Sequence, residues 1–341
     1  MKILITGGAG FIGINCAAYF CRQGNEVIIF DNLSRAGAQQ NIDWLAAHHP
    51  CRLVRGDIRN YTEITQVFAE HGPFELIIHL AAQVAVTTSV SNPREDFEIN
   101  AYGTFNLLEA ARHLNKEAVI IYASTNKVYG GMEDLKITEI AGRYAYLDHP
   151  EGIAETRPLD FHSPYGCSKG AADQYCRDYY RIYGLRTIVM RQSCIYGYHQ
   201  FGIEDQGWVA WFCIAAALNK PITIYGDGKQ VRDVLFIDDL VSLYDQAYQN
   251  IDVIAGKIFN IGGGPLHTLS LHELLAQLEL LKGAKIPIRY DNWRPGDQKV
   301  YISNIDAAEK VFGWKPRITV IEGIENLYDW ILRNKSLFKK I

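Results

Sequence analysis

Apolar runs of three to five residues alternate with helix-like segments over the first 190 residues of the chain. The runs at 3–5, 27–30, 52–54, 76–80, 118–122 and 187–190 are typical of buried strands. Between them, segments 16–21, 64–70 and 97–114 carry apolar residues at helical spacing. This alternation builds right-handed βαβ units. It predicts an α/β fold with a Rossmann-type doubly wound parallel sheet, covered by helices on both faces, over residues 1–191.

The pattern becomes less regular after residue 191. A loop with several glycines leads to a helix over 208–218, and short strands then alternate with helices to the end of the sequence. One later helix begins with a capping box, formed by Ser270 and by Glu273 three residues on. We expect a smaller C-terminal α/β substrate lobe over 192–341, with the chain returning to the first lobe around 234–261.

A glycine-rich turn follows the first apolar run directly. Gly7 suits the tight turn, Gly10 lets a pyrophosphate approach the backbone, and Gly13 lets the next helix pack closely on the strand. The second apolar run ends in Asp31, 24 residues after Gly7, where a carboxylate accepts hydrogen bonds from a ribose and repels a 2′-phosphate. The pattern therefore predicts NAD(H) as the cofactor, although Arg35 leaves room for NADP(H).

Tyr165 and Lys169 lie four residues apart in a long helical segment, so they share one helix face. A phenol is a poor base at neutral pH, but a nearby ammonium together with a positive nicotinamide ring favours its phenolate. The pair, in a chain that already carries a dinucleotide pattern, predicts that Tyr165 takes a proton from a substrate alcohol.

The composition excludes several classes of protein. The chain has 341 residues, enough for a large core, and 48% of them are hydrophobic. A formal net charge of −4 gives no reason to expect nucleic acid, and no apolar run approaches the roughly 18 residues of a membrane span. Seven cysteines without a Cys-x-x-Cys pair and ten histidines without a metal-binding pattern predict free thiols and no metal. We expect a cytoplasmic protein with no membrane partner.

The glycine-rich turn, Asp31 and the Tyr165/Lys169 pair together resemble the motifs of a known family over the whole length of the chain. Further segments that carry the resemblance are 56–59, 79–83, 100–104 and 124–130. The chain resembles the extended short-chain dehydrogenases/reductases of the nucleotide-sugar epimerase and dehydratase group. The resemblance implies that Thr125 is the hydroxyl partner of Tyr165 in catalysis, with Lys169 as the third catalytic residue. The NAD contacts that it implies are Gly7, Gly10, Phe11, Ile12, Asp31, Asn32, Ser34, Arg35, Asp57, Ile58, Leu80, Ala81, Ala82, Asn100, Ser124, Tyr165 and Lys169.

Departures from the group's sequence patterns reduce the number of reactions that the protein is expected to catalyse. Hexose dehydratases of the group carry an acid and a base directly after the position of Thr125, where this chain has Asn126 and Lys127. An amide and an ammonium do not replace a carboxyl pair, so dehydration is disfavoured. Many 4-epimerases have small residues there and an asparagine at the position of Cys194. The chain is most similar to the branch that epimerises a nucleotide hexose at carbon 2. A 4-epimerase, a nucleotide-sugar reductase and a non-catalytic NAD-binding regulator remain alternatives.

The remaining expectations concern the substrate. Arg232 and Arg294 match family positions that hold the ribose and diphosphate, and a guanidinium suits a bidentate grip on phosphate. The substrate contacts that the resemblance implies are Asn126, Lys127, Cys194, Gln206, Trp208, Arg232 and Arg294. The insertion over 140–160 is either a surface loop or a substrate lid. The nucleotide base is open among CDP, GDP and UDP, and we expect a homodimer or homotetramer.

Overall fold

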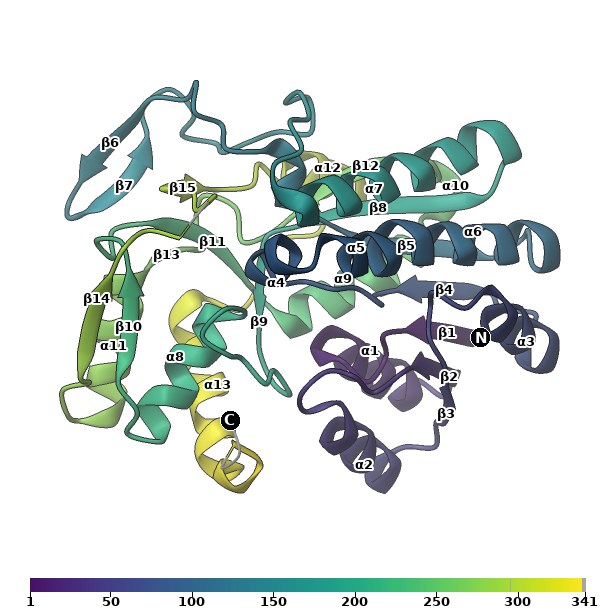
Figure 1. Cartoon of the computed structure of the whole chain (residues 1–341), viewed down its shortest axis with the longest axis horizontal. Coiled ribbons are helices and arrows are strands. Elements are labelled where there is room, and N and C mark those ends of the chain that lie inside the picture. The colour runs from purple at the N-terminus through teal and green to yellow at the C-terminus, as the bar shows by residue number, and fades with distance from the viewer. Residues whose placement is uncertain (295, 339–341) are drawn as a thin grey trace. The chain divides into compact units, whose positions relative to one another are not determined.

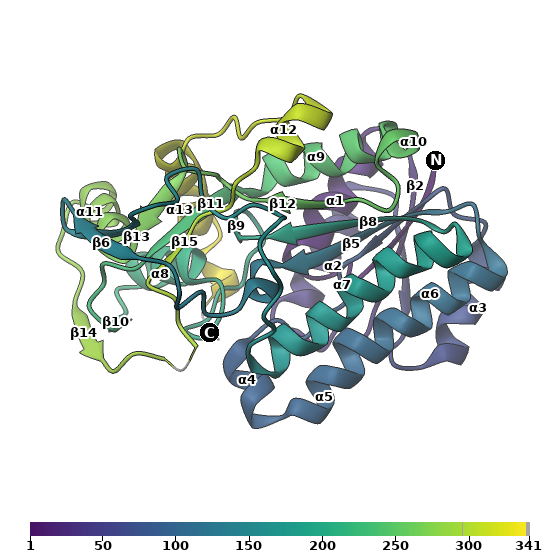
Figure 2. The same cartoon turned by 90° about the horizontal axis from the view of Figure 1, so that it is seen from above.

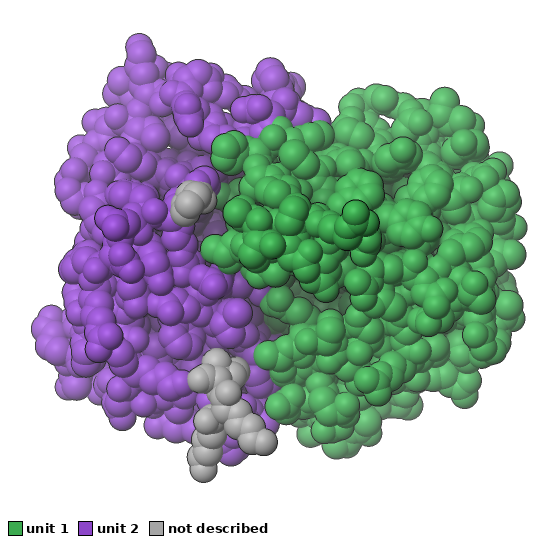
Figure 3. Space-filling view, in the orientation of Figure 1, with its two compact units in different colours: residues 1–128, 161–191, 241–259 green, residues 129–160, 192–240, 260–341 purple. Residues whose placement is uncertain are grey.

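The structure is a computed structural model that describes residues 1–294 and 296–338. The chain divides into two compact units, which Figure 3 colours separately. Unit 1 comprises residues 1–128, 161–191 and 241–259, and unit 2 comprises residues 129–160, 192–240 and 260–341.

Unit 1 is built on a seven-stranded sheet with the strand order β12-β8-β5-β4-β1-β2-β3 (Figure 1). β1 pairs in parallel with β2 and β4, β2 pairs in parallel with β3, and β4 pairs in parallel with β5. The order reverses at β1, as a doubly wound sheet requires, so the predicted fold class is confirmed. The strands are β1 (Lys2–Thr6), β2 (Glu26–Asp31), β3 (Arg52–Arg55), β4 (Leu76–His79), β5 (Val119–Thr125), β8 (Arg186–Gln192) and β12 (Ile258–Ile261).

Helices cover both faces of this sheet (Figure 2). On one face, apolar side chains of α3, α6 and α7 pack in one core with Leu4, Ile28, Ile77 and Ile120 of the strands. On the other face, α1 packs on β1 and β2, and its Tyr19 hydroxyl donates to the neighbouring helix α9. The helices are α1 (Phe11–Arg22), α2 (Ala38–His48), α3 (Tyr61–His71), α4 (Val86–Ser91), α5 (Pro93–Phe97), the π-helix η1 (Glu98–Tyr102), α6 (Gly103–Leu114), the 3-10 helix η2 (Asn126–Tyr129), α7 (Ser163–Tyr183), α9 (Ile237–Gln249) and α10 (Ile251–Ile254).

Unit 2 is organised around β11, which pairs with β9, β13 and β15. The predicted capping box is confirmed, because Ser270 Oγ accepts the Glu273 N–H and the Glu273 side chain accepts the Ser270 N–H at the start of α11. The elements are β6 (Ile137–Ile140), β7 (Arg143–Tyr146), β9 (Cys194–Tyr196), β10 (Ile222–Tyr225), β11 (Val231–Phe236), β13 (Thr268–Ser270), β14 (Ile288–Asp291), β15 (Val300–Tyr301), α8 (Trp208–Ala217), α11 (Leu271–Lys282), α12 (Asp306–Phe312), α13 (Val320–Arg333) and η3 (Lys335–Phe338).

The division of the chain differs from the predicted one in two places. Residues 129–160 were expected in the first lobe but belong to unit 2, and the return to unit 1 covers 241–259 rather than 234–261. The first difference arises because the antiparallel hairpin β6–β7 is held by unit 2 side chains. Arg143 forms an ion pair with Glu273 at 2.8 Å, and the Tyr144 hydroxyl donates to Asp227 at 2.6 Å.

Candidate active site

The turn after β1 has the geometry of a phosphate-binding loop. Gly7 has a φ of 70°, and a Cβ on it would lie 2.6 Å from the Ala81 backbone nitrogen. A Cβ at position 13 would lie 2.5 Å from the Gly7 carbonyl oxygen, so glycine there allows α1 to pack on the turn. No side chain caps the N-terminus of α1 at Gly10. The first N–H groups of α1, from Phe11 onward, are therefore available to an anion.

Asp31 ties this turn to the end of β2. Its Oδ2 accepts the Ala9 N–H at 3.0 Å, and its Oδ1 accepts the Leu33 N–H at 2.8 Å. Burial raises the pKa of this carboxyl, while the two backbone hydrogen bonds lower it. Arg35 lies two residues beyond Leu33, is exposed, and accepts the Ala38 N–H at its carbonyl. The two backbone hydrogen bonds therefore fix the orientation of the Asp31 carboxylate, which suits a group that accepts hydrogen bonds from a ribose at the end of β2.

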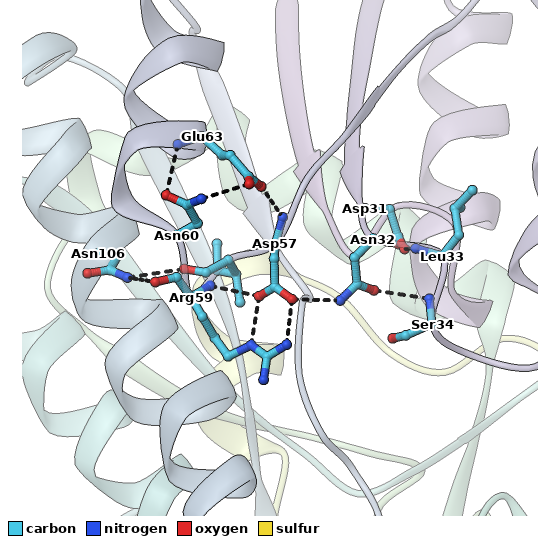
Figure 4. Close-up of polar contacts among 10 residues, drawn as sticks. Asp31, Asn32, Leu33, Ser34, Asp57, Arg59, Asn60, Glu63 and Asn106 are labelled. Atoms are coloured by element: carbon cyan, nitrogen blue, oxygen red, sulfur yellow. Dashed lines mark hydrogen bonds and ion pairs between the residues drawn. The ribbon is translucent and has the colours of Figure 1, made fainter.

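A second polar cluster follows β3 (Figure 4). Arg59 donates to both oxygens of Asp57, from Nε at 2.9 Å and from Nη2 at 2.7 Å. The Asn32 side chain donates to Asp57 at 3.1 Å and accepts the Ser34 N–H at 3.0 Å. These contacts, with Arg59 first, lower the pKa of Asp57 to about 2. The structure thus brings together Asn32, Ser34 and Asp57, and adds Arg59, which sequence reasoning had quoted without a role.

Three further residues with predicted cofactor contacts lie in the loop after β4. Leu80 donates its N–H to the Thr6 carbonyl, Ala81 donates its N–H to the Thr6 hydroxyl at 3.4 Å, and Ala82 follows. The Ile58 side chain is instead buried in the core of unit 1, where it packs toward α6. Only the backbone of Ile58 lies in the loop after β3, where its carbonyl oxygen accepts a hydrogen bond from the side-chain amide of Asn106.

Asn100 and Ser124 are engaged by the protein itself. Asn100 is buried, accepts the Gln83 N–H at 2.9 Å, and donates to the Gln83 carbonyl at 3.0 Å. The Ser124 hydroxyl donates to the buried Asp173 carboxylate at 2.7 Å. Both residues were expected to contact the cofactor; in the structure they fix the loop after β4 and the end of β5.

The predicted catalytic residues gather at the start of α7 and the end of β5. Ser163 has a φ of 67°, and its hydroxyl accepts the Gly166 N–H at 3.3 Å. The Tyr165 N–H donates to the Ser89 hydroxyl at 3.1 Å. Two backbone donors of the first turn are thereby satisfied by serines. Thr125, the last residue of β5, interacts with Tyr165 through a side-chain hydrogen bond. Ser89, which lies 76 residues before Tyr165, is a positioning contact that sequence reasoning missed.

Burial governs the acidity of this pair. It raises the pKa of Tyr165 to about 12, while the hydrogen bond with Thr125 lowers it. Burial also lowers the pKa of Lys169 to about 8. The Lys169 ammonium donates to the Ala123 carbonyl at 2.6 Å and lies 4.3 Å from the centre of the Tyr122 ring. Burial therefore dominates the Tyr165 pKa, and the lowering predicted from the ammonium together with a bound nicotinamide stays a prediction.

The residues that follow Thr125 form η2. Asn126 is buried, and its Oδ1 accepts a hydrogen bond from the Thr125 hydroxyl at 3.3 Å. Lys127 is half-buried and donates its N–H to the same hydroxyl at 3.2 Å. The predicted pair of an amide and a lysine therefore lies directly beside the predicted catalytic threonine.

In unit 2, the two arginines with predicted phosphate contacts each have a carboxylate partner. Arg232 pairs with Asp297 at 2.6 Å, and Arg294 pairs with Asp205 at 3.0 Å. Arg294 also lies 3.8 Å from the centre of the Tyr225 ring. Because the Asp297 N–H donates to the Arg294 carbonyl, both arginines belong to one polar cluster. The acidic partners were not predicted, since each lies far from its arginine in sequence.

The other unit 2 residues with predicted substrate contacts occupy strand and helix starts. Cys194 opens β9 and pairs with Val234 of β11. Gln206 closes a short bridge with Ile203, beside the Asp205 partner of Arg294. Trp208 begins α8, and its indole N–H is buried without a hydrogen-bond partner among the described residues. An unpaired buried donor of this kind suits a ligand acceptor.

The insertion over 140–160 does not have the contacts of a free lid. Besides the Tyr144 and Arg143 contacts, the Tyr146 hydroxyl donates to the Val300 carbonyl at 2.9 Å, and Lys229 pairs with Glu139 at 2.8 Å. Every one of these partners belongs to unit 2. The hairpin is therefore a fixed part of that unit.

Three other observations limit the chemistry. Over residues 1–294 and 296–338, no three His, Cys, Asp or Glu side chains are grouped to hold a metal. Each of the seven cysteines is a free thiol. No helix in the described part of the chain is both long and apolar enough to cross a membrane.

The fold and the motif residues define an extended short-chain dehydrogenase/reductase: the chain belongs to the GDP-mannose 4,6-dehydratase family, whose model matches residues 4–327. A CDP-paratose 2-epimerase of Salmonella typhi is 49% identical over 337 residues, covering 97% of this chain and 99% of that protein. A UDP-glucuronate 4-epimerase of Thermodesulfobacterium geofontis is 30% identical, covering 99% of this chain and 98% of that protein.

Solved structures resemble the whole chain as well. A UDP-glucose 4-epimerase from Thermotoga maritima, solved with UDP-glucose, has a TM-score of 0.83 at 29% identity and covers 98% of this chain and 100% of that one. A dTDP-glucose 4,6-dehydratase from Streptomyces venezuelae, solved with NAD, has a TM-score of 0.85 at 27% identity and covers 100% of this chain and 99% of that one.

Proposed function

We propose that the protein is an NAD-dependent epimerase that inverts carbon 2 of a CDP-activated hexose, as in the conversion of CDP-paratose to CDP-tyvelose. The observation that carries the proposal is the 49% identity, over nearly the full length of both proteins, to a CDP-paratose 2-epimerase. The residues after Thr125 support it, because Asn126 and Lys127 offer no carboxyl pair for removing water.

NAD is the cofactor in this proposal, and the residues of unit 1 fit it. The uncapped N-terminus of α1 suits the diphosphate, Asp31 suits the adenosine ribose, and Asp57 suits the adenine amine. When bound, NAD supplies a hydride acceptor that returns the same hydride, so the cycle needs no external oxidant.

The chain's own residues handle the proton and the substrate. Tyr165 takes the proton of the carbon 2 hydroxyl and later returns it, and Thr125 hydrogen-bonds the oxygen on which charge develops. Lys169 supplies positive charge one helical turn from Tyr165. With NAD bound, Tyr165 would lie under the influence of a second positive charge, that of the nicotinamide, which would favour its phenolate.

Unit 2 holds the nucleotide in this proposal. Arg232 and Arg294 grip the diphosphate, and the buried indole N–H of Trp208 donates to the nucleotide. With the diphosphate fixed, the hexose turns about its bonds to the phosphate and presents the other face of its 2-ketone. Cys194 and Gln206 of the same unit are further proposed substrate contacts, as Asn126 and Lys127 are in unit 1.

An isotope experiment tests the reaction. The purified protein is incubated with CDP-paratose that carries deuterium at carbon 2, and the product is identified by NMR. Full retention of deuterium at carbon 2 of CDP-tyvelose, with none entering from deuterated water, is expected. Solvent deuterium at carbon 2 would contradict the oxidation route. Inversion at carbon 4 instead would favour a 4-epimerase, accumulation of NADH or of a reduced sugar would favour a reductase, and no conversion of any nucleotide hexose would favour a regulator.

We also propose that the protein is a cytoplasmic homo-oligomer, a dimer or a tetramer. The seven free thiols fit a reducing compartment. Aromatic side chains on α6 and α7 contact one another in a row, with half-buried Phe105 in edge contact with Tyr175 and buried Tyr179 in edge contact with exposed Tyr183. Tyr175 and Ile182 are 48% and 65% exposed, an arrangement suited to a second copy of the chain.

A further inference from the structure

Asp96 is a buried carboxylate behind the predicted catalytic pair. It is the fourth residue of α5, only 1% exposed, and it forms no ion pair with any described residue. A buried carboxylate that forms no direct ion pair is costly, so it calls for an explanation beyond packing. Neither the sequence motifs nor the proposed reaction uses it.

The hydrogen bonds of Asp96 place its charge against the catalytic turn of α7. Gln83 donates to Oδ1 at 2.8 Å, Asn100 donates to Oδ1 at 3.1 Å, and the Ser168 hydroxyl donates to Oδ2 at 2.5 Å. Ser168 is the residue before Lys169, and its hydroxyl also lies 3.2 Å from the Tyr165 carbonyl. Two of the three donors are side-chain amides, which suits the acceptor-only, ionised carboxylate.

The charge of Asp96 acts on both members of the pair. It raises the pKa of Tyr165, in the same direction as burial. It also raises the pKa of Lys169, against burial and after the larger effects of Cys176 and Asp173. Among the groups that set the Tyr165 pKa, Asp96 is the one charged side chain. Burial raises the pKa of Asp96 itself, while Ser168 and Gln83 lower it through hydrogen bonds.

Other titratable groups on the surrounding elements are neutral, paired or at the surface. Burial lowers the pKa of His79 to about 3 and raises the pKa of Tyr122 and of Cys176, so all three are uncharged at neutral pH. The Asp173 carboxylate is compensated by Arg191, at 2.9 and 3.0 Å. On α5, Glu95 is half-buried, and Arg94 pairs with Glu98 of η1. The other groups on η1 and η2 are exposed Tyr102, half-buried Lys127 and Tyr129, whose hydroxyl donates to Asn260.

We propose that Asp96 is a positioning residue that sets, by its charge, the pH range in which Tyr165 and Lys169 work. The proposal rests on the proposed function, in which Tyr165 exchanges the substrate proton. The carboxylate holds Ser168 and Asn100 and keeps Lys169 protonated, and in return it makes Tyr165 a weaker acid. The pH range of catalysis therefore depends partly on Asp96 of α5, a residue outside the catalytic motif.

Asp96→Asn separates charge from geometry. The amide oxygen still accepts from Gln83 and Asn100, and the amide nitrogen donates to the Ser168 hydroxyl, whose proton then turns to the Tyr165 carbonyl 3.2 Å away. Without the charge, both Tyr165 and Lys169 are expected to lose their protons at lower pH. Both limbs of the pH profile of kcat/KM should therefore move to lower pH by about half a unit or more.

A direct titration accompanies the kinetics. The protein is labelled with 13Cζ-tyrosine, and the Tyr165 signal is assigned by its loss in Tyr165→Phe. Its titration midpoint should fall in Asp96→Asn by about half a unit or more. Because this measurement needs no substrate, it tests the role of Asp96 even if the protein does not act on a CDP-hexose.

Two control variants complete the test. Glu95→Gln removes a neighbouring, more exposed carboxylate and should leave both pH limbs in place. Ser89→Ala removes the acceptor of the Tyr165 N–H without a change of charge, and should lower kcat without moving the limbs. A folded Asp96→Asn with an unchanged profile and an unchanged Tyr165 titration would overturn the proposal, as would an equal shift in Glu95→Gln. If Asp96→Asn does not fold, Asp96→Ser is measured by the same two readouts and judged by the same outcomes.

Discussion

Tyr165 is held by its backbone as well as by its ring. Ser89 accepts its N–H, Ser163 accepts the N–H of the next residue, and Thr125 meets its hydroxyl. The phenol oxygen is therefore the part of the residue whose removal disturbs least of the structure.

We predict that Tyr165→Phe lowers kcat by ~100- to 10,000-fold, because the proton acceptor is lost while the ring keeps its packing. The initial rate of CDP-paratose epimerisation, followed by NMR, measures this. NAD affinity should change by less than about threefold, since the ring remains. Tyr180→Phe, at an exposed tyrosine of the same helix, is the matched control and should retain full activity. A loss of less than tenfold in Tyr165→Phe would remove Tyr165 from the mechanism.

Asp31 carries a second prediction at this scale, the preference for NAD over NADP. Its carboxylate is fixed by two backbone N–H groups, so it cannot turn away from a 2′-phosphate. In isothermal titrations of nucleotide-free protein, we expect NAD to bind at least about tenfold tighter than NADP, and Asp31→Ala to reduce that ratio by about tenfold or more. Asp43→Ala, at an exposed carboxylate of α2, should leave it unchanged. Tighter binding of NADP by the wild-type protein would assign the site to the other cofactor.

Sequence reasoning at the residue scale found side chains that are close to each other in the chain or that belong to motifs. The four-residue spacing of Tyr165 and Lys169 was enough to place both on α7. Ser89 and Asp96 gave no such signal, because they lie 76 residues and 72 residues from their α7 partners Tyr165 and Ser168. A serine or an aspartate in a short polar helix does not by itself indicate a functional role. Only the folded structure shows that Ser89 and Asp96 contact the first turns of α7.

At the scale of elements, the strands of unit 1 were predicted well because each is a compact apolar run. The 76–80 run corresponds to β4, and 118–122 corresponds to β5. The segment 97–114 was expected as one helix, but it is the end of α5, a π-helix and α6. The π-helix has no local signature in the apolar pattern, since it keeps roughly helical spacing. The hairpin β6–β7 was missed for a different reason, because the side chains that hold it, Arg143 and Tyr144, pair with partners far away in the sequence.

Strand β11 carries a prediction about pH and stability. Asp233 is fully buried on it, and burial raises the pKa of its carboxyl to about 6, above the ordinary 3.8. The folded state therefore binds this proton more tightly than the unfolded state, so the contribution of Asp233 to stability is fully present below its ordinary pKa of 3.8 and is lost as the pH rises through about 6. Relative to Asp233→Asn, the wild-type free energy of unfolding should fall by about 2 kcal/mol between pH 4.5 and pH 7.5. Urea unfolding of both proteins measures it, and a difference that stays constant with pH would refute the assignment.

At the scale of the whole molecule, the fold class follows from the alternation of strands and helices, whereas the boundaries of the two units do not. No low-complexity linker separates residues 129–160 from the preceding part of the chain. Their assignment to unit 2 depends on contacts such as Arg143 with Glu273, 130 residues away. Patterns within a few neighbouring residues cannot predict contacts between residues so far apart in the sequence.

The exposed side chains of Tyr175 and Ile182 on α7 lead to a prediction about assembly. Tyr175→Arg combined with Ile182→Arg should convert the oligomer to a monomer, because two charges would be buried in the interface. Sedimentation velocity at micromolar concentration measures the change. The matched control, Val253→Arg on α10, replaces an apolar residue that is 65% exposed, and should leave the oligomer intact. An unchanged sedimentation coefficient in the double variant would place the interface elsewhere.

The chain passes between the two units five times, after residues 128, 160, 191, 240 and 259. This has a consequence for recombination between relatives, natural or in the laboratory. A single crossover at residue 191 would join most of unit 2 from one parent to the 129–160 segment of the other. Arg143 and Tyr144 would then contact side chains from a different parent at positions 273 and 227. Moving unit 2 intact requires three separate segments, 129–160, 192–240 and 260–341. Chimeras that transfer sugar specificity between such enzymes should therefore succeed when they exchange all three segments together, and should lose stability when they exchange only the C-terminal one.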